Sequence, residues 1–96
     1  MVEINNLEDL NVEKVMKVNK IINEKYDTTY GLLSRGNLHF CINKNSPYEI
    51  SKNIIEKHPF IDGNKRTALV IYLLLTSDKK LEKIIKDYDL VLKNLI

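Results

Sequence analysis

The eight residues from Ala68 to Leu75 form the longest apolar run in this chain of 96 residues. A helix that crosses a membrane needs about 20 apolar residues, so this run is too short to span a bilayer. A helix that is apolar around its whole circumference is normally buried at the centre of a domain. We therefore expect a central, buried helix from about Asn64 to Thr76.

Two further helices are expected toward the ends of the sequence. Between residues 7 and 22, apolar side chains recur at roughly helical spacing, with lysines and glutamates between them. Asn6 or Asn11 could cap this helix, because an asparagine side chain accepts a hydrogen bond from a first-turn N–H group. Near the other end, Ser77 or Asp78 would cap a last helix that carries Leu81, Ile84, Ile85, Leu92 and Leu95.

A further helix, in the middle of the chain, has the clearest boundaries. Ser46-Pro47-Tyr48-Glu49 combines a capping box with a proline at the first helical position, so this helix should begin at Pro47. The ring of Pro59 pushes the preceding residue, His58, away from helical geometry. The helix should therefore end at His58.

The only strand signal in the sequence lies between the helix expected over residues 7–22 and the helix expected to begin at Pro47. Two short apolar-rich runs, Tyr30-Gly31-Leu32-Leu33 and Leu38-His39-Phe40-Cys41-Ile42, flank the turn-like Ser34-Arg35-Gly36-Asn37. This pattern predicts a β-hairpin, which would need support from the helices because a lone hairpin is marginal in water. The expected fold is all-α: a single domain over residues 1–96, with about four helices and one short β-hairpin.

Composition and charge narrow the classes of function. The formal net charge of +2 is too small to suggest a nucleic-acid partner, which usually requires a concentrated basic face. The single cysteine, Cys41, excludes an internal disulfide framework and is typical of a reducing compartment. The first ten residues carry acids and asparagines where a signal peptide has basic and then apolar residues. We expect a cytoplasmic protein that binds neither nucleic acid nor a membrane.

The run from His58 to Arg66, His-Pro-Phe-Ile-Asp-Gly-Asn-Lys-Arg, carries the chemistry of the chain. Taken singly, its residues say little, because a lone histidine at a helix end is usually structural and Asp-Gly-Asn is a common turn sequence. Lys65 and Arg66, however, stand where the positive end of the helix dipole disfavours cations. Two cations beside open backbone N–H groups indicate that an anion such as phosphate is bound there.

Two other interpretations of this run fail. A P-loop needs a glycine at position 58, where this chain has histidine, and a strand that leads into the turn, which the sequence does not predict. A structural zinc site needs several Cys or His ligands, whereas this chain offers only Cys41, His39 and His58, without ligand-like spacing.

The run from His58 to Arg66 resembles the signature of the Fic/Doc family, H-x-F-x-(D/E)-x-N-(G/K)-R. The recognisable similarity extends from about Gly31 to Leu75. The resemblance implies a Fic/Doc-like helical bundle with a hairpin flap, and a transferase that uses ATP and Mg²⁺. In such a protein His58 would be the general base that takes the proton from a hydroxyl of the target protein.

The resemblance also implies roles for the other signature residues. Asp62 would hold Mg²⁺, which bridges and neutralises nucleotide phosphates. Backbone N–H groups around Gly63 and Asn64 would form an anion hole, whose shape Asn64 fixes. Lys65 and Arg66 would complete the nucleotide site, with Arg66 clamping phosphate oxygens. Phe60 would anchor the loop in the core, and the hairpin would align the target by strand addition, mainly through Leu38, His39 and Phe40.

Two positions differ from the pattern of Fic proteins that transfer nucleotides. Lys65 stands where those proteins have glycine, and Leu69 stands where they have a second arginine. Both are features of the Doc branch, the toxins of toxin–antitoxin modules. This implies transfer of the γ-phosphoryl group of ATP to a Ser or Thr hydroxyl of a target protein, in the translation machinery.

The chain lacks a recognisable inhibitory motif of its own. Self-inhibited Fic proteins carry a Ser/Thr-x-x-x-Glu pattern, but here Ser51 is followed four residues later by Ile55 and Ser77 by Leu81. The resemblance therefore implies a separate antitoxin. An antitoxin or a second copy in a homodimer would cover apolar surface left by the short chain, above all at Leu92, Leu95 and Ile96.

Two alternatives to phosphate transfer stay open at this stage. The first is AMP transfer, the commoner Fic reaction, against which Lys65 and Leu69 argue. The second is a non-catalytic interaction module on the same scaffold, against which the intact His58, Asp62 and Arg66 argue.

Overall fold

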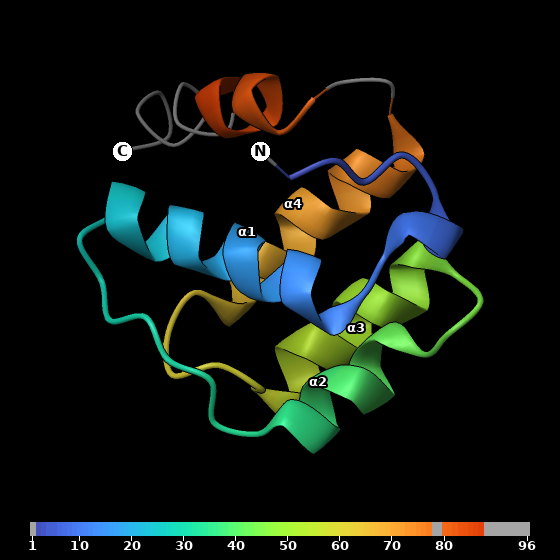
Figure 1. The fold of residues 1–96 in the computed structure, drawn as a ribbon, viewed down its shortest axis with the longest axis horizontal. Helices are drawn as coiled ribbons and strands as arrows, with labels where there is room; N and C mark the ends of the chain where they lie inside the picture. Colours follow the sequence, from blue (N-terminus) through green and yellow to red (C-terminus); the bar gives the residue numbers. More distant parts are fainter. Residues whose placement is uncertain (1, 78–79, 88–96) are drawn as a thin grey trace.

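The computed structural model describes residues 2–77 and 80–87, and these residues are mostly helical. A short 3₁₀ helix, η1 (Leu7–Asp9), precedes α1 (Val12–Lys25), α2 (Arg35–Ile42), α3 (Pro47–Lys57) and α4 (Asn64–Thr76). Residues 81–87 are helical as well. Helix α4 packs against both α1 and α3, and α2 packs against α3 and α1 (Figure 1). No helix in these ranges is both long and apolar enough to cross a membrane.

Helix α4 has the predicted bounds and occupies the predicted central place. It buries its apolar side chains on the faces toward α1 and α3, including Ala68, Val70, Ile71 and Leu74. The helix is not buried on every side, however, because Leu69 and Tyr72 remain 40% and 36% exposed. These two side chains lie along a groove between α3 and α4 that no other described element fills.

The predicted caps of α1 and α3 are confirmed. Asn11 caps α1 by accepting a hydrogen bond from the N–H of Lys14 at 2.8 Å, and Asn6 caps η1 in the same way. Ser46 caps α3 by accepting one from the N–H of Glu49 at 3.4 Å. Helix α3 ends at Lys57, as the proline two residues later requires.

The predicted last helix is described only over residues 81–87, where Leu81 and Ile84 are buried. Ser77 ends α4 as its C-terminal cap instead of starting that helix. The other predicted cap, Asp78, lies outside the described residues, as do Leu92, Leu95 and Ile96.

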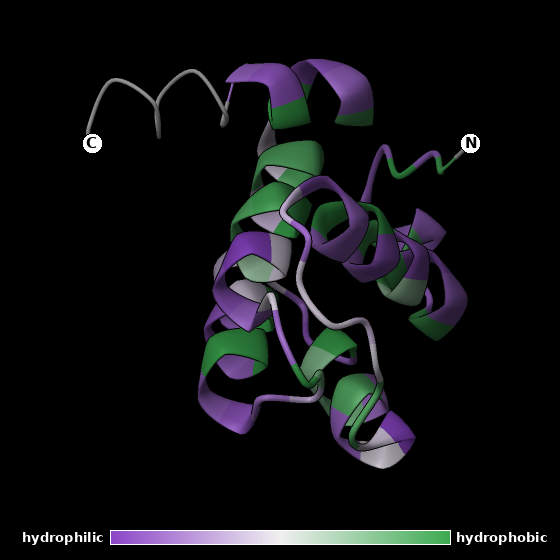
Figure 2. Ribbon diagram, turned by 90° about the vertical axis from the view of Figure 1, so that its left-hand side faces the viewer, coloured by the Kyte–Doolittle hydropathy of each residue, from purple (hydrophilic) through white to green (hydrophobic). Residues whose placement is uncertain are grey.

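The core is built from apolar stripes at helical spacing. Figure 2 shows the alternation of apolar and polar segments along the helices. Helix α1 contributes Val15, Val18 and Ile22, all at most 2% exposed. Cys41 of α2 is buried as well, as expected of a small apolar side chain, and its burial raises the pKa of the thiol.

The predicted β-hairpin is wrong. The residues expected to form its turn and second strand make helix α2 instead, with Ser34 as the N-cap that accepts a hydrogen bond from the N–H of Asn37 at 3.1 Å. The residues from Ser34 to Asn37 therefore form the N-cap and first turn of a helix and not the turn of a hairpin. The two fully buried side chains, Leu38 and Cys41, stand three residues apart, which is helical spacing and not the alternation of a strand.

The first run of the predicted hairpin is extended, but it pairs with another part of the chain. Leu32 forms an isolated antiparallel bridge with Phe60. The N–H of Ile61 donates to the carbonyl of Gly31 at 2.9 Å, and the N–H of Leu33 donates to that of Pro59 at 2.7 Å. The segment before α2 therefore lies along the signature loop between α3 and α4.

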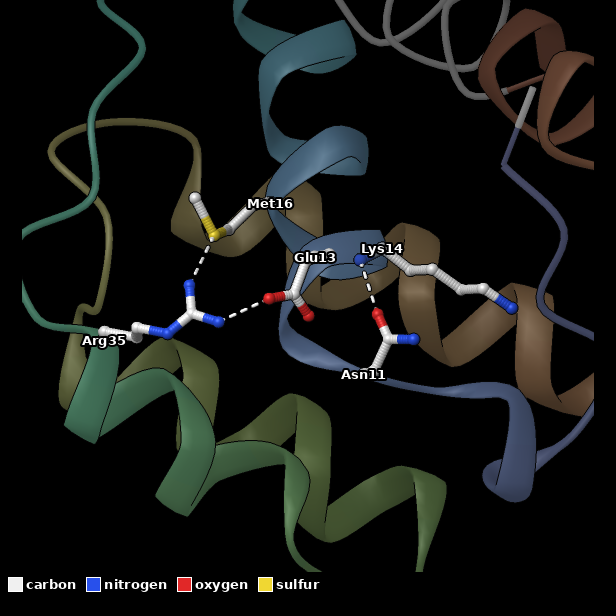
Figure 3. Close-up of polar contacts among 5 residues, drawn as sticks. All are labelled: Asn11, Glu13, Lys14, Met16 and Arg35. Atoms are coloured by element: carbon white, nitrogen blue, oxygen red, sulfur yellow. Dashed lines mark hydrogen bonds and ion pairs between the residues drawn. The ribbon is translucent and has the colours of Figure 1, made fainter.

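A polar contact on the surface joins the start of α2 to α1. The guanidinium of Arg35 donates to the carboxylate of Glu13 and lies 3.7 Å from the sulfur of Met16 (Figure 3). This hydrogen bond is the main reason that the pKa of Glu13 lies below its usual value. Both charged side chains are well exposed.

Candidate active site

The loop between α3 and α4 is a closed bend. Its first residue, His58, adopts the left-handed conformation with φ 47° and donates its N–H to the carbonyl of Ile54 at 3.2 Å. The side chain of Asn64 closes the bend from the other end. Its carbonyl oxygen accepts from the N–H of Phe60 at 3.0 Å, and its amide donates to the carbonyl of Phe60 at 2.9 Å.

Phe60 and Asn64 are the fixed points of this bend. Phe60 is fully buried, and Asn64 is 7% exposed. Because the side chain of Asn64 satisfies both backbone groups of Phe60, no water needs to enter the bend to pair them. Phe60 is thus anchored in the core, and the side chain of Asn64 closes the bend around its backbone.

Gly63 begins α4 in a conformation that suits glycine. Its φ of 77° is in the left-handed region, where a side chain is strained. A Cβ atom there would lie 3.2 Å from Oδ1 of Asn23 and 3.3 Å from Nδ2 of Asn19. The first hydrogen bond of the helix runs from the N–H of Thr67 to the carbonyl of Gly63, so the N–H groups of residues 64–66 lie before the helical ladder.

A buried polar cluster on α1 forms hydrogen bonds to this bend. Asn19 and Asn23 are both fully buried, one helical turn apart. The amide of Asn19 donates to the carbonyl of Asp62 at 2.9 Å and to the hydroxyl of Thr67 at 3.0 Å. The amide of Asn23 donates to Oδ1 of Asn19 at 2.9 Å and to the carbonyl of Asp62 at 3.4 Å. The hydroxyl of Thr28 donates to Oδ1 of Asn23 at 2.6 Å.

The signature residues surround a single pocket. Its volume is about 490 Å³, and its lining consists of His58, Ile61, Asp62, Gly63, Asn64, Lys65 and Arg66. His58 and Asp62 are both exposed, so their side chains are accessible from solvent. The structure thus brings together in one place every residue that the sequence assigned to base, metal ligand and nucleotide binding.

The two cations at the start of α4 are held differently. The guanidinium of Arg66 stacks on the ring of Tyr26, with Cζ 4.2 Å from the ring centroid. Tyr26 ends α1, so α1 contacts the site both through its asparagines and through this ring. Lys65 is exposed and lies between the site pocket and the groove of α3 and α4.

The residues predicted to dock a target are not part of this pocket. Leu38 is buried in the core, whereas His39 and Phe40 are exposed on α2. All three are helical, so they offer no strand edge for pairing with a peptide. The extended segment beside the signature loop is instead the one around Leu32.

The residues that line this pocket lie within a stretch of sequence that matches a known protein family. The family model described as Fic/DOC family matches residues 20–76, more than half of the chain. The chain belongs to the Fic/DOC family. Members of this Fic/DOC family are typically transferases. A search of curated proteins and a search of solved structures each found no match.

The Fic/DOC match begins at residue 20, within α1, and so reaches further than the similarity recognised in the sequence. Sequence reasoning missed Asn19, Asn23 and Tyr26 as residues that contact the Fic/DOC signature loop. A signal was present for two of them. Asn19 and Asn23 share a helix face with Val15, Val18 and Ile22, and polar residues on an apolar face are buried with partners.

Proposed function

We propose that this Fic/DOC protein is a Doc-like toxin of a toxin–antitoxin module. It transfers the γ-phosphoryl group of ATP to a serine or threonine hydroxyl of a target protein in the translation machinery. The observation that carries the proposal is the single pocket shared by His58, Asp62, Gly63, Lys65 and Arg66. Catalysis of phosphoryl transfer consists mainly of positioning and charge stabilisation, which this set of groups can supply.

In the proposed reaction, the hydroxyl oxygen of the target forms a bond to the γ-phosphorus of ATP. The bond from that phosphorus to the oxygen bridging to the β-phosphate breaks, and ADP leaves with the bridging oxygen and its electron pair. His58 takes the hydroxyl proton as general base, a role for which an exposed imidazole at the pocket wall is suited. Arg66 and the N–H groups at the start of α4 stabilise the phosphate charge.

Asp62 is the residue proposed to hold Mg²⁺. The ion would neutralise phosphate charge during the transfer. An exposed carboxylate at the pocket fits this ion, because proteins usually hold Mg²⁺ through one or two carboxylates together with substrate phosphates. The described residues contain no group of three or more metal-ligating side chains. In this part of the chain, Mg²⁺ would therefore depend on the nucleotide for further ligands.

Two positions favour phosphate transfer over AMP transfer. Lys65 adds bulk and charge where a glycine would let a phosphate approach the backbone. Leu69 leaves one cation fewer for the far end of a triphosphate. It lies one turn beyond Lys65 and lines a groove of about 350 Å³ with Tyr48, Ile55 and Tyr72, outside the lining of the site pocket.

The deciding experiment compares the fate of two phosphates. The protein is incubated in a cell extract with ATP labelled on the α- or the γ-phosphate, in parallel. Label retained by a target only from the γ position supports the proposal, whereas label retained from the α position means AMP transfer. Intact mass of the target gives the same answer, with a gain of about 80 Da for phosphate and about 329 Da for AMP.

The His58→Ala variant tests whether the protein is an enzyme at all. We expect this variant to lose target labelling and growth inhibition, because the general base is removed. Glu24→Ala, an exposed change on α1, is the matched control that should keep both. Equal growth inhibition by the wild type and by His58→Ala would show that inhibition does not require catalysis. It would favour an interaction module on the Fic scaffold.

A separate antitoxin belongs to the proposal. Co-expression of the chain with the product of an adjacent gene should relieve growth inhibition and yield a stable complex on purification. Growth inhibition by the chain that no adjacent gene product relieves would contradict this part of the proposal.

A further inference from the structure

The carbonyl of the peptide bond between Asp62 and Gly63 is held by two side chains of α1. It accepts from the amide of Asn19 at 2.9 Å and from that of Asn23 at 3.4 Å. Both asparagines are fully buried on α1, so this carbonyl points into the protein. A buried carbonyl that is paired in this way is costly to turn around, because its partners would be left unsatisfied.

The direction of the carbonyl fixes the direction of the neighbouring N–H. The described part of the chain contains no cis peptide bond, and in a planar trans peptide the C=O and N–H bonds point in opposite directions. The N–H of Gly63 therefore points away from α1. Gly63 lines the site pocket, whereas neither Asn19 nor Asn23 is among the residues that line it. The pocket therefore lies on the side of the loop that faces away from these two asparagines.

We infer that Asn19 and Asn23 are positioning residues of the anion site, which aim the N–H of Gly63 into the pocket by holding the Asp62 carbonyl inward. The inference rests on the proposed function, because the anion it serves is a nucleotide phosphate. Hydrogen bonds to the carbonyl also polarise the same peptide unit and strengthen its N–H as a donor.

The order of the hydrogen bonds shows how the amides are themselves fixed. Thr28 donates to Oδ1 of Asn23, Asn23 donates to Oδ1 of Asn19, and Asn19 donates to Thr67 and to the Asp62 carbonyl. Each asparagine therefore has its oxygen occupied by a donor, which leaves its nitrogen facing the next acceptor. The chain of bonds runs in one direction and ends at the peptide of the anion site.

The three glycines of this chain allow a direct test in the full-length protein. Labelling with ¹⁵N-glycine gives amide signals for Gly31, Gly36 and Gly63 alone, and Gly36→Ala assigns one of them by its loss. On titration with inorganic pyrophosphate, we expect the Gly63 proton signal to move downfield while those of Gly31 and Gly36 stay nearly fixed. A Gly63 signal that does not respond while pyrophosphate binds overturns the inference in the wild type, before any variant is made.

The Asn19→Leu variant tests the positioning role. It keeps the approximate size of the side chain and removes the donor to the Asp62 carbonyl. We expect the chemical-shift change of Gly63 to be lost. Pyrophosphate affinity should fall about tenfold or more, because the hydrogen bond from the Gly63 N–H to the charged pyrophosphate is lost. Asn23→Ser, which removes the longer bond and the support of Asn19, should show a smaller loss and covers the case that Asn19→Leu does not fold.

The matched control is Ser51→Ala. Ser51 also donates from a buried side chain to a helix carbonyl, that of Ala68 at 2.9 Å, and this acceptor lies within α4 and not in the loop. This variant should lower the melting temperature and leave both the Gly63 shift and the affinity unchanged. If the asparagine variants behave like Ser51→Ala, their role is only structural and the inference fails. If the wild type binds neither pyrophosphate nor ATP, the proposed function fails, and the inference fails with it.

Discussion

Two polar clusters join α1 to distant parts of the chain, and they differ in burial. The Asn19–Asn23 cluster bonds the signature loop about 40 residues later through fully buried amides. The Glu13–Arg35 pair bonds the start of α2 through two exposed charged groups. Charge alone would rank the second cluster higher, but water already solvates exposed ions and competes for them. A buried neutral amide that loses its partner has no such substitute.

The comparison therefore predicts that contacts around the signature loop matter more for stability and function than the surface ion pair. We expect the effect of a substitution to fall as the side chain or contact that it removes becomes more exposed.

Asn64→Ala should have the largest effect on stability. It removes both hydrogen bonds to Phe60 and leaves a buried N–H and a buried C=O unpaired, which should cost about 3 kcal/mol of unfolding free energy. Urea denaturation measures this loss. Asn53→Ala on α3, where the amide donates to a carbonyl of its own helix at 2.8 Å, is the control and should cost well under half as much. Similar losses for the two variants would mean that the bend is not held by Asn64.

Gly63→Ala should destabilise by about 2 kcal/mol, because a side chain at positive φ is strained and its Cβ would press on the amides of Asn19 and Asn23. Gly36→Ala is the opposite case. It lies in α2, where a Cβ would meet only Ser34 Oγ at 3.9 Å, and it should stabilise by up to about 1 kcal/mol. Thermal unfolding of the two variants should show shifts of opposite sign; a shared sign would refute this account of the glycines.

Tyr26→Leu tests a contact of intermediate burial. Loss of the ring under Arg66 should weaken pyrophosphate binding by about fivefold, as for a cation–π contact of about 1 kcal/mol. Calorimetric titration measures the affinity. Arg66→Lys should weaken binding too, because an ammonium lacks the planar fork and stacks less well. Unchanged affinity in Tyr26→Leu would show that the ring does not hold the guanidinium in solution.

Glu13→Gln should have the smallest effect, and that effect should depend on pH. Because Arg35 lowers the pKa of Glu13 in the folded state, the pair stabilises above the unfolded carboxyl pKa of about 4.3 and loses this contribution as pH falls through the folded pKa. The difference in unfolding free energy between wild type and variant should shrink on acidification and in high salt. If the difference in unfolding free energy stays constant from about pH 6 to about pH 3, it does not arise from the ionised carboxylate of Glu13.

Local signals in the sequence determined the helix boundaries of α3 and α4. Ser46 and Pro47 fix a start and Pro59 forces an end, because capping and proline geometry act within a few residues. The signature run likewise determined which residues line the pocket, since they are adjacent in the chain. The hairpin prediction failed because the Gly-Asn pair and the apolar residues around it are compatible both with a hairpin turn and with the first turn of a helix.

What only the tertiary structure decided is how distant segments meet the loop. The pairing of Leu32 with Phe60, the stacking of Tyr26 on Arg66 and the bonds from Asn19 to Asp62 all join residues far apart in sequence. A polar residue on an apolar helix face indicates that its side chain has a buried hydrogen-bond partner. Which partner it finds depends on how α1 packs on α4, because the hydrogen bond forms only where packing brings donor and acceptor within about 3 Å.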